Sequence, residues 1–206
     1  HLSGDRGLVD AFARGEDIHR ATASEVFAVE PMFVTGEQRR RAKAINFGLI
    51  YGMGARRLAQ SLEMSVGEAR ALLDKYFEGF PQLAAWREQA QAQARKTLML
   101  ETVSGRKLKL NPDKISSTLA LNYPVQGGGA DLIKWAAVRF VRSIKQIKGQ
   151  PALVNMVHDE LLVEVDLEAA EEVRQLLVES MVSAGADLFP SVPMAVDARI
   201  SEAWEH

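Results

Sequence analysis

Residues 39–52 read Arg-Arg-Arg-Ala-Lys-Ala-Ile-Asn-Phe-Gly-Leu-Ile-Tyr-Gly. Every fourth residue of this stretch is a cation or an aromatic: Arg39, Lys43, Phe47 and Tyr51. On an α-helix, residues four apart lie on one face, so these side chains form a stripe about 18 Å long. The stretch therefore predicts a helix that carries cations near its beginning and aromatic rings near its end.

The order of the stripe suits a nucleoside triphosphate, with a polyphosphate at one end and a flat base at the other. The preceding residues 35–38, Thr-Gly-Glu-Gln, fit a capping box. The cations would then lie near the helix N-terminus, where unpaired N–H groups and the helix dipole favour anions. We expect Gly48 and Gly52 to clear space beside the rings. The simpler alternative is a solvated basic face followed by core aromatics.

Composition sets wider limits on the function. The chain has 206 residues, of which 47% are hydrophobic and 25% charged, with a net charge of −2. A chain of this composition has no global basic signature of nucleic-acid binding, although a local basic stripe can bind phosphates. The absence of cysteine excludes disulfides and thiolate metal sites. With no apolar run of membrane-spanning length and no signal peptide, we expect a cytoplasmic protein that does not bind membranes.

The pattern along the chain predicts an α+β fold, rich in helices, with a small antiparallel sheet. Pro124 is expected to break a helix and residues 126–129, Gln-Gly-Gly-Gly, to form a flexible hinge. Helices are expected at 6–29 (two, broken at Gly15), 35–52, 55–63, 66–77, 81–96, 116–123, 131–146 and 168–184. Strands are expected at 98–103, 106–110, 152–157, 160–165 and 194–200.

A candidate metal site lies between the strands at 152–157 and 160–165. His158, Asp159 and Glu160 occupy the tip of this predicted hairpin. Mg²⁺ prefers carboxylate oxygen and takes only one or two protein carboxylates, so a rigid tip bearing Asp159 suits it. The alternative is that turn chemistry alone favours Asp159 and that Glu160 is simply exposed.

Two further segments contain candidate binding residues. His19 follows Asp17 at the start of a predicted helix and could bind a ligand. The simpler alternative is that Asp17 caps this helix and that His19 is an ordinary surface residue. Asn122 and Gln126 flank Pro124, and their amides could accept and donate in a DNA minor groove without strong sequence selection. Alternatively, these amides satisfy backbone groups at a helix end.

Together these segments resemble family A DNA polymerases. The family's motif Arg-x-x-x-Lys-x-x-x-Phe/Tyr-Gly-x-x-Tyr-Gly matches residues 39–52 without a gap. Residues 158–160, His-Asp-Glu, match its third polymerase motif, and residues 15–22 and 122–127 also resemble family segments. The resemblance covers essentially the whole chain.

For the nucleotide, the resemblance implies that Arg39 and Lys43 hold the triphosphate and that His19 donates a hydrogen bond to it. Phe47 would pack on the incoming nucleotide and Tyr51 would lie near the templating base. Lys43 would also neutralise charge on the leaving phosphates, which makes it a catalytic residue.

For the metal and the DNA, the resemblance implies that Asp159 is the principal Mg²⁺ ligand and catalytic carboxylate, with Glu160 as the secondary one. Asn122 and Gln126 would follow the primer–template minor groove, and His158 would lie near the primer terminus. A two-metal site needs a partner Asp, which we expect on a polymerase segment upstream of His1, in the same or a separate chain.

The family resemblance also implies a domain division and a reaction. Residues 24–115 would be fingers, whereas 1–23 and 116–206 would belong to the palm. The expected activity is DNA-directed DNA synthesis in replication and repair, with primer–template DNA and dNTPs as partners, at a bacterial or phage-type nucleoid. Two places depart from the family pattern. The family commonly has a basic residue where this chain has Thr118, and small residues with hydroxyl groups where it has the glycines at 127–129.

Three rival functions remain open at this point. A single-subunit RNA polymerase shares the Arg-x-x-x-Lys and His-Asp elements but lacks the Phe-Gly that stands here at 47–48. A binding module without turnover would follow if the chain holds only half of a metal site. A metal-dependent nuclease has no use for the cation–aromatic stripe.

Overall fold

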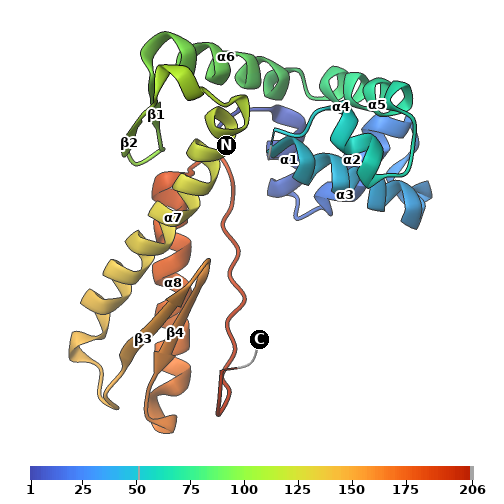
Figure 1. Cartoon of the computed structure of the whole chain (residues 1–206). Coiled ribbons are helices and arrows are strands. Elements are labelled where there is room, and N and C mark those ends of the chain that lie inside the picture. The colour runs from blue at the N-terminus through green and yellow to red at the C-terminus, as the bar shows by residue number, and fades with distance from the viewer. Residues whose placement is uncertain (51, 205–206) are drawn as a thin grey trace. The chain divides into compact units, whose positions relative to one another are not determined.

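The structure is a computed structural model that describes residues 1–50 and 52–204, apart from the side chain of Ile50. It has the predicted α+β composition (Figure 1). The α-helices are α1 (Arg6–Ala13), α2 (Ile18–Phe27), α3 (Gly36–Ile50), α4 (Ala55–Ser61), α5 (Val66–Gly79), α6 (Pro81–Thr97), α7 (Ser117–Ser143) and α8 (Ala170–Leu188). Two antiparallel hairpins pair β1 (Met99–Glu101) with β2 (Lys107–Lys109) and β3 (Ala152–Val157) with β4 (Glu160–Glu164).

Single turns of 3₁₀-helix connect several of these elements: η1 (Pro31–Phe33), η2 (Pro112–Lys114), η3 (Ile144–Gln146) and η4 (Leu167–Ala169). The chain divides into two compact units, one formed by residues 1–101 and 105–125, the other by 102–104 and 126–206. The division falls within α7.

In the first unit, α2, α3, α4 and α5 pack around one hydrophobic core. Its buried members include Val26 of α2, Ile45 of α3, Leu58 of α4 and Tyr76 of α5. Burial in this core raises the pKa of the Tyr76 hydroxyl. Because α3 buries one face here, its opposite face is left to solvent.

A buried carboxylate joins two helix starts in the same unit. Asp5 is only 1% exposed and caps α1 by accepting from the backbone N–H of Leu8. Its second oxygen accepts from the N–H groups of Gln82 and Leu83, at 3.1 and 3.2 Å, in the first turn of α6. The start of the chain is thereby tied to a helix that begins 76 positions later, at Pro81.

In the second unit, the β3–β4 hairpin packs against α8 and the C-terminal part of α7 (Figure 1). Phe140 of α7 and Val173 of α8 are buried, with Leu153 and Val163 of the two strands packed against them. The register pairs Val157 with Glu160, which leaves His158 and Asp159 as a two-residue loop. The base of the hairpin therefore packs against the helices, although its strands are half-buried and exposed and do not form a buried sheet.

The predicted break at Pro124 is wrong, because α7 runs through this residue from Ser117 to Ser143. A proline inside a helix removes a hydrogen bond at a cost of about 3 kcal/mol. Here both flanks of the helix are anchored in buried cores, by Ala120 and Leu121 before the proline and by Ile133 and Phe140 after it. Tertiary burial thus outweighs the local cost.

The glycines at 127–129 lie in α7 and form no hinge. A Cβ on Gly128 would come within 3.1 Å of the Phe189 ring and 3.7 Å of Val103, so this glycine permits a close approach. Gly129, in contrast, faces open space.

The predicted final strand at 194–200 is also wrong. These residues form no strand in the described part of the chain, although half-buried and exposed residues alternate from Ser191 to Arg199. Period-two alternation is the pattern of a strand, but a strand also requires a neighbour for its backbone hydrogen bonds. Over residues 1–50 and 52–204, no helix is long and apolar enough to span a bilayer.

Candidate nucleotide-binding site

Helix α3 begins with the capping box that the sequence predicts. The backbone N–H of Thr35 donates to the Gln38 side chain at 2.9 Å, and the N–H of Gln38 donates to the Thr35 hydroxyl at 3.2 Å. These bonds satisfy two N–H groups that the helix itself cannot pair. The beginning of the stripe is thereby fixed.

The stripe faces solvent where the structure describes it. Ala42 and Ile45 are fully buried on the opposite face of α3, whereas Lys43 and Phe47 are exposed. Phe47 keeps 47% of its surface accessible, although Ile45 and Gly48 near it on the helix are buried. Tyr51, the last residue of the predicted stripe, lies outside the described residues.

Lys43 and Phe47 contact each other along the helix. The Lys43 ammonium lies 5.8 Å from the centre of the Phe47 ring, within range of a cation–π interaction. Within the described part of the chain, Lys43 forms no ion pair. Its charge and the exposed ring therefore remain available to a ligand.

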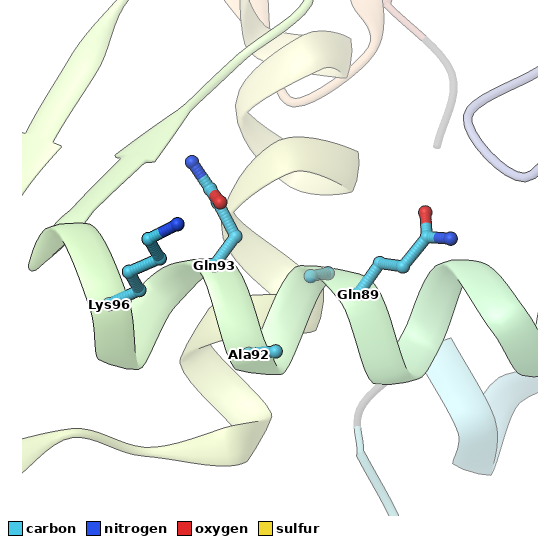
Figure 2. A pocket seen from close by; sticks show the side chains of 5 residues that line it. Gln89, Ala92, Gln93 and Lys96 are labelled. Atoms are coloured by element: carbon cyan, nitrogen blue, oxygen red, sulfur yellow. The ribbon is translucent and has the colours of Figure 1, made fainter.

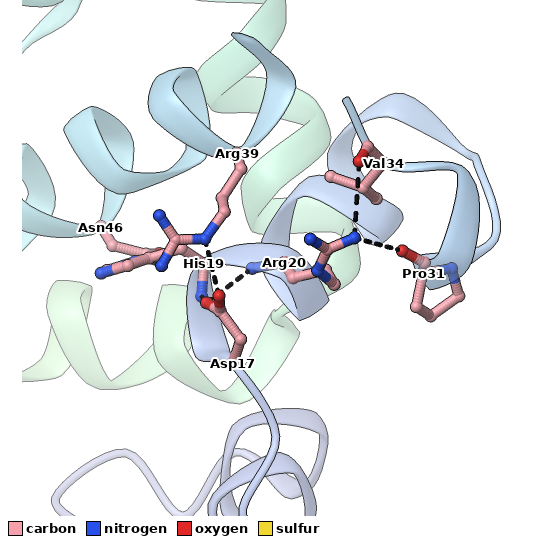
Figure 3. Close-up of polar contacts among 7 residues, drawn as sticks. All are labelled: Asp17, His19, Arg20, Pro31, Val34, Arg39 and Asn46. Carbon is pink, nitrogen blue, oxygen red and sulfur yellow. Dashed lines mark hydrogen bonds and ion pairs between the residues drawn. The ribbon is translucent and has the colours of Figure 1, made fainter. Parts of the chain in front are cut away.

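Arg39 has a different neighbour. Its guanidinium donates to the Asp17 carboxylate at 2.6 Å, and Asp17 also caps α2 by accepting from the N–H groups of His19 and Arg20 (Figure 3). The hydrogen bond from Arg39 is the main cause that lowers the pKa of Asp17. Arg40 and Arg41 instead pair with Glu37 on their own helix and hold the pKa of that carboxyl at about 2.

His19 completes the cluster from α2. Its ring centre lies 5.9 Å from that of Phe47, with a tilt of 37° between the planes. Burial lowers the pKa of His19, and the charges of Arg39 and Lys43 lower it further, whereas Asp17 acts in the opposite direction. The neutral imidazole is therefore favoured between two cations. The sequence-predicted residues Arg39, Lys43, Phe47 and His19 are thus brought to one surface.

Sequence reasoning overlooked Asn46. Its Nδ2 lies 3.1 Å from Nδ1 of His19 and 3.0 Å from the hydroxyl of Thr22, which is fully buried. The available signal was a polar amide between Ile45 and Phe47, at a position that borders the stripe. The ion-pairing role of Asp17 was also missed, because only its capping role follows from local sequence.

Other segments of the chain come close to the two stripe glycines, Gly48 and Gly52. A Cβ on Gly48 would lie 2.8 Å from the sulfur of Met53, and one on Gly52 would lie 2.9 Å from the backbone of Thr118. Gly52 has φ +65° and its N–H bonds to Leu49, while Met53 N–H bonds to Gly48, as in a Schellman C-terminus. Gly52 thus ends α3 in a left-handed conformation, and both glycines let neighbouring segments approach the backbone closely.

The second candidate site is the β3–β4 tip. His158, Asp159 and Glu160 are all exposed there. His158 has φ +51°, a conformation that is uncommon for residues other than glycine and recurs at functional sites. Among the described residues, no group of three or more His, Asp or Glu side chains could hold a metal ion. The tip therefore offers two adjacent carboxylates.

Asn122 and Gln126 both lie within α7 and not at a helix end. Gln126 is exposed, whereas the Oδ1 atom of Asn122 is buried and has no hydrogen-bond partner within the described residues. The alternative that these amides satisfy a broken helix end is therefore wrong.

An open depression of about 540 Å³ lies against one face of α6, lined by Gln89, Ala90, Ala92, Gln93 and Lys96 (Figure 2). Its lining residues come from a single helix and include none of the predicted site residues. The surface formed by the stripe and His19, in contrast, is built from two helices, α2 and α3.

The model of DNA polymerase family A matches residues 1–206 of the chain. This chain belongs to DNA polymerase family A. It is 38% identical to DNA polymerase I of Aquifex aeolicus over 96% of its own length, and 40% identical to DNA polymerase I of Pseudomonas aeruginosa over 100% of it. The aligned region covers 35% and 23% of those two polymerases, so the chain spans about a quarter to a third of their length.

Family A membership extends to the fold. The polymerase domain of Pol1 from M. smegmatis, solved in complex with DNA primer-template and dNTP, matches the chain with a TM-score of 0.86 at 38% identity. The match covers 96% of this chain and 36% of that one. The family resemblance drawn from the motifs is therefore confirmed.

Proposed function

We propose that this chain is part of a DNA-directed DNA polymerase and that it holds the incoming dNTP and one side of the metal site. The observation that carries the proposal is the convergence of Arg39, Lys43, Phe47 and His19 on one solvent-facing surface from α2 and α3. The solved relative that holds primer-template and dNTP supports the same substrates. Family A membership favours DNA synthesis over RNA synthesis.

Each residue of the surface has a chemical role in this proposal. Arg39 and His19 donate to triphosphate oxygens, and Phe47 packs on the nucleotide. The 3′-hydroxyl of the primer attacks the α-phosphorus, and pyrophosphate leaves. Lys43 neutralises the charge that develops on the leaving phosphates and provides a proton for them. Tyr51 is proposed to lie near the templating base.

The β3–β4 tip fits half of a magnesium site. Mg²⁺ typically takes one or two protein carboxylates and completes its shell with water and phosphate oxygens, which suits the exposed pair Asp159 and Glu160. When bound, two such ions would activate the primer hydroxyl and stabilise the leaving oxygens. We propose that Asp159 is the principal ligand, Glu160 the secondary one, and that an upstream segment contributes a further carboxylate.

Exposed apolar side chains in the second unit also support the proposal of an upstream segment. Trp135, Val138 and Val141 of α7 are 43%, 50% and 41% exposed, and Val154 and Met156 of β3 are 49% and 43% exposed. A two-stranded sheet is marginal by itself and is stabilised by further strands. We propose that the upstream segment covers these residues.

DNA contacts follow from the same assignment. Asn122 and Gln126 are proposed to follow the minor groove and His158 to lie near the primer terminus, with residues 24–115 as fingers and 1–23 and 116–206 as palm. A protein with this function would act at the nucleoid in the cytoplasm.

The small number of carboxylates at the hairpin tip favours a second function, a module that binds nucleotide without catalysis. Because the described residues offer only two adjacent carboxylates at the tip, the chain alone would bind nucleotide without turning it over. The test is Mg²⁺-dependent primer extension by this chain alone and with an upstream family A segment supplied. We expect extension only in the second case. Nucleotide binding with no extension in either case would favour the binding module, and absence of both would contradict the proposed function.

A further inference from the structure

The Asn46–Thr22 pair beside the stripe contacts His19 and can determine which of its ring nitrogens carries the proton. The Thr22 hydroxyl donates to Oδ1 of Asn46 at 3.2 Å and accepts from Nδ2 at 3.0 Å. Nδ2 has a second hydrogen, and the atom within its reach is Nδ1 of His19, at 3.1 Å. In this orientation both hydrogens of the Asn46 amide have an acceptor, one in the Thr22 hydroxyl and one in the His19 ring. In the flipped orientation the amide oxygen would face the ring, and only one of the two hydrogens would have an acceptor among these groups.

The contact selects one form of the ring. An amide NH₂ group can only donate, so Nδ1 of His19 must accept and cannot carry a proton. The ring proton of the neutral imidazole then resides on Nε2. Nε2–H is a hydrogen-bond donor, as a group that binds phosphate oxygen must be.

We propose that Asn46 is a positioning residue that fixes the Nε2–H tautomer and ring orientation of His19, so that a donor is presented to the triphosphate. The inference rests on the proposed nucleotide-binding function. It assigns a role in this site to a residue outside the Arg39–Lys43–Phe47 stripe. Thr22, fully buried behind Asn46, is the anchor of the amide.

The site chemistry explains the need for such control. His19 faces Asp17 from its own helix and Arg39 and Lys43 from α3. A neutral ring in water can place its proton on either nitrogen, and the Nδ1–H form would present a lone pair to phosphate at Nε2. Asn46 removes that form without adding charge.

The first readout is spectroscopic and does not depend on polymerase activity. Long-range ¹H–¹⁵N correlation spectra of the chain distinguish the two tautomers, and His19→Gln identifies the resonances. We expect Nε2–H in the wild type. Asn46→Asp, which replaces the donor by an acceptor, should move the proton to Nδ1 or protonate the ring. A wild-type ring in the Nδ1–H form would overturn the proposal.

The second readout is binding of dATP with Mg²⁺ to the same chain. Loss of one positioning hydrogen bond in Asn46→Ala should weaken binding about 2- to 10-fold. In a His19→Gln background, Asn46→Ala should have no added effect, because its partner is gone. An undiminished effect in that background would show a merely structural role and refute the proposal.

A further variant covers the case in which Asn46→Ala does not fold. Thr22→Val keeps the buried volume but releases the amide, and it should broaden or mix the His19 tautomers; an unchanged ring would count against the proposal. If the tautomer behaves as expected but no variant or wild type binds dATP, the proposed function fails while the Asn46–His19 coupling stands.

Discussion

Arg39 and Lys43 lie one turn apart on α3 but meet different neighbours. Arg39 is paired with Asp17, whereas Lys43 touches only the Phe47 ring among the contacts described. In the proposed function, an arriving triphosphate would therefore compete with Asp17 for Arg39, whereas the Lys43 ammonium would already be accessible to it. At this scale, Lys43 of the candidate site is accessible, whereas Arg39 is paired with the carboxylate of Asp17.

Lys43→Ala tests the charge at the leaving phosphates. With an upstream segment supplied, we expect the rate of single-nucleotide incorporation to fall by about 10²- to 10³-fold, because a preorganised charge at the transition state is lost. Binding of primer–template should change little. Arg40→Ala is the matched control, since Arg40 is on the same helix but pairs with Glu37, and it should incorporate nearly as the wild type does. Equal rates for both variants would remove Lys43 from the mechanism.

The titration of His19 tests the electrostatics of the cluster. Because burial and two cations lower its pKa, the native state binds fewer protons than the unfolded chain below the ordinary value of about 6.5. The contribution of His19 to stability is therefore present above that value and is lost as the pH falls toward the native pKa.

NMR titration of two variants checks this sign. Asp17→Asn keeps a helix cap but removes the anion, so it should lower the pKa of His19 further, whereas Arg39→Gln should raise it. Shifts in the reverse sense would mean that other groups control the ring.

At the scale of elements, Asp5 links the starts of two helices, α1 and α6. Asp5→Ala removes the α1 cap and deprives the N–H groups of Gln82 and Leu83 of their carboxylate acceptor. We expect the free energy of unfolding to fall by about 2–4 kcal/mol, measured by urea denaturation. Asp10→Ala, at an exposed site of the same helix, should change it by less than about 0.5 kcal/mol. A similar loss in both would contradict the described role of Asp5.

Neighbouring glycines in α7 provide an internal comparison. Gly129→Ala should stabilise the chain by about 0.5–1 kcal/mol, since alanine favours helix and the site is open. Gly128→Ala should gain less or lose, because its Cβ would press on Phe189 at 3.1 Å. Thermal unfolding of the two variants decides the matter: a larger gain at Gly128 would argue against the close packing.

Local signals in the sequence predicted the elements that depend on local chemistry. The Thr35–Gln38 capping box and the two-residue turn after Val157 both form as expected. Pro124 was misjudged because burial on both sides of it, which no local pattern reveals, keeps α7 intact. The segment 194–200 has a strand's alternation, but pairing depends on a partner that its own sequence does not specify.

The same distinction applies to the candidate site. Arg39, Lys43 and Phe47 follow from a fourfold period on one helix, so their common face was predictable. Asn46 and Asp17 gain their roles only because α2 packs across α3, which places Asn46 against His19 and Asp17 against Arg39. Residues that act between elements are therefore the ones that sequence reasoning missed.

At the scale of the whole molecule, the two parts of the proposed polymerase site lie one in each unit. The proposed nucleotide-binding surface lies in the first unit, and the hairpin tip with Asp159 lies in the second. Phosphoryl transfer requires both parts and, in our account, a carboxylate from an upstream segment.

The most direct test of this account is Mg²⁺-dependent single-nucleotide incorporation with the upstream segment supplied, comparing wild type, Asp159→Asn and Asp166→Asn. Asp166 is an exposed carboxylate of the same unit that lies away from the hairpin tip and serves as the control. We predict that Asp159→Asn abolishes incorporation while still binding primer–template, and that Asp166→Asn retains it. Incorporation by Asp159→Asn at the wild-type rate would contradict the assignment of the metal site and, with it, the proposed polymerase mechanism.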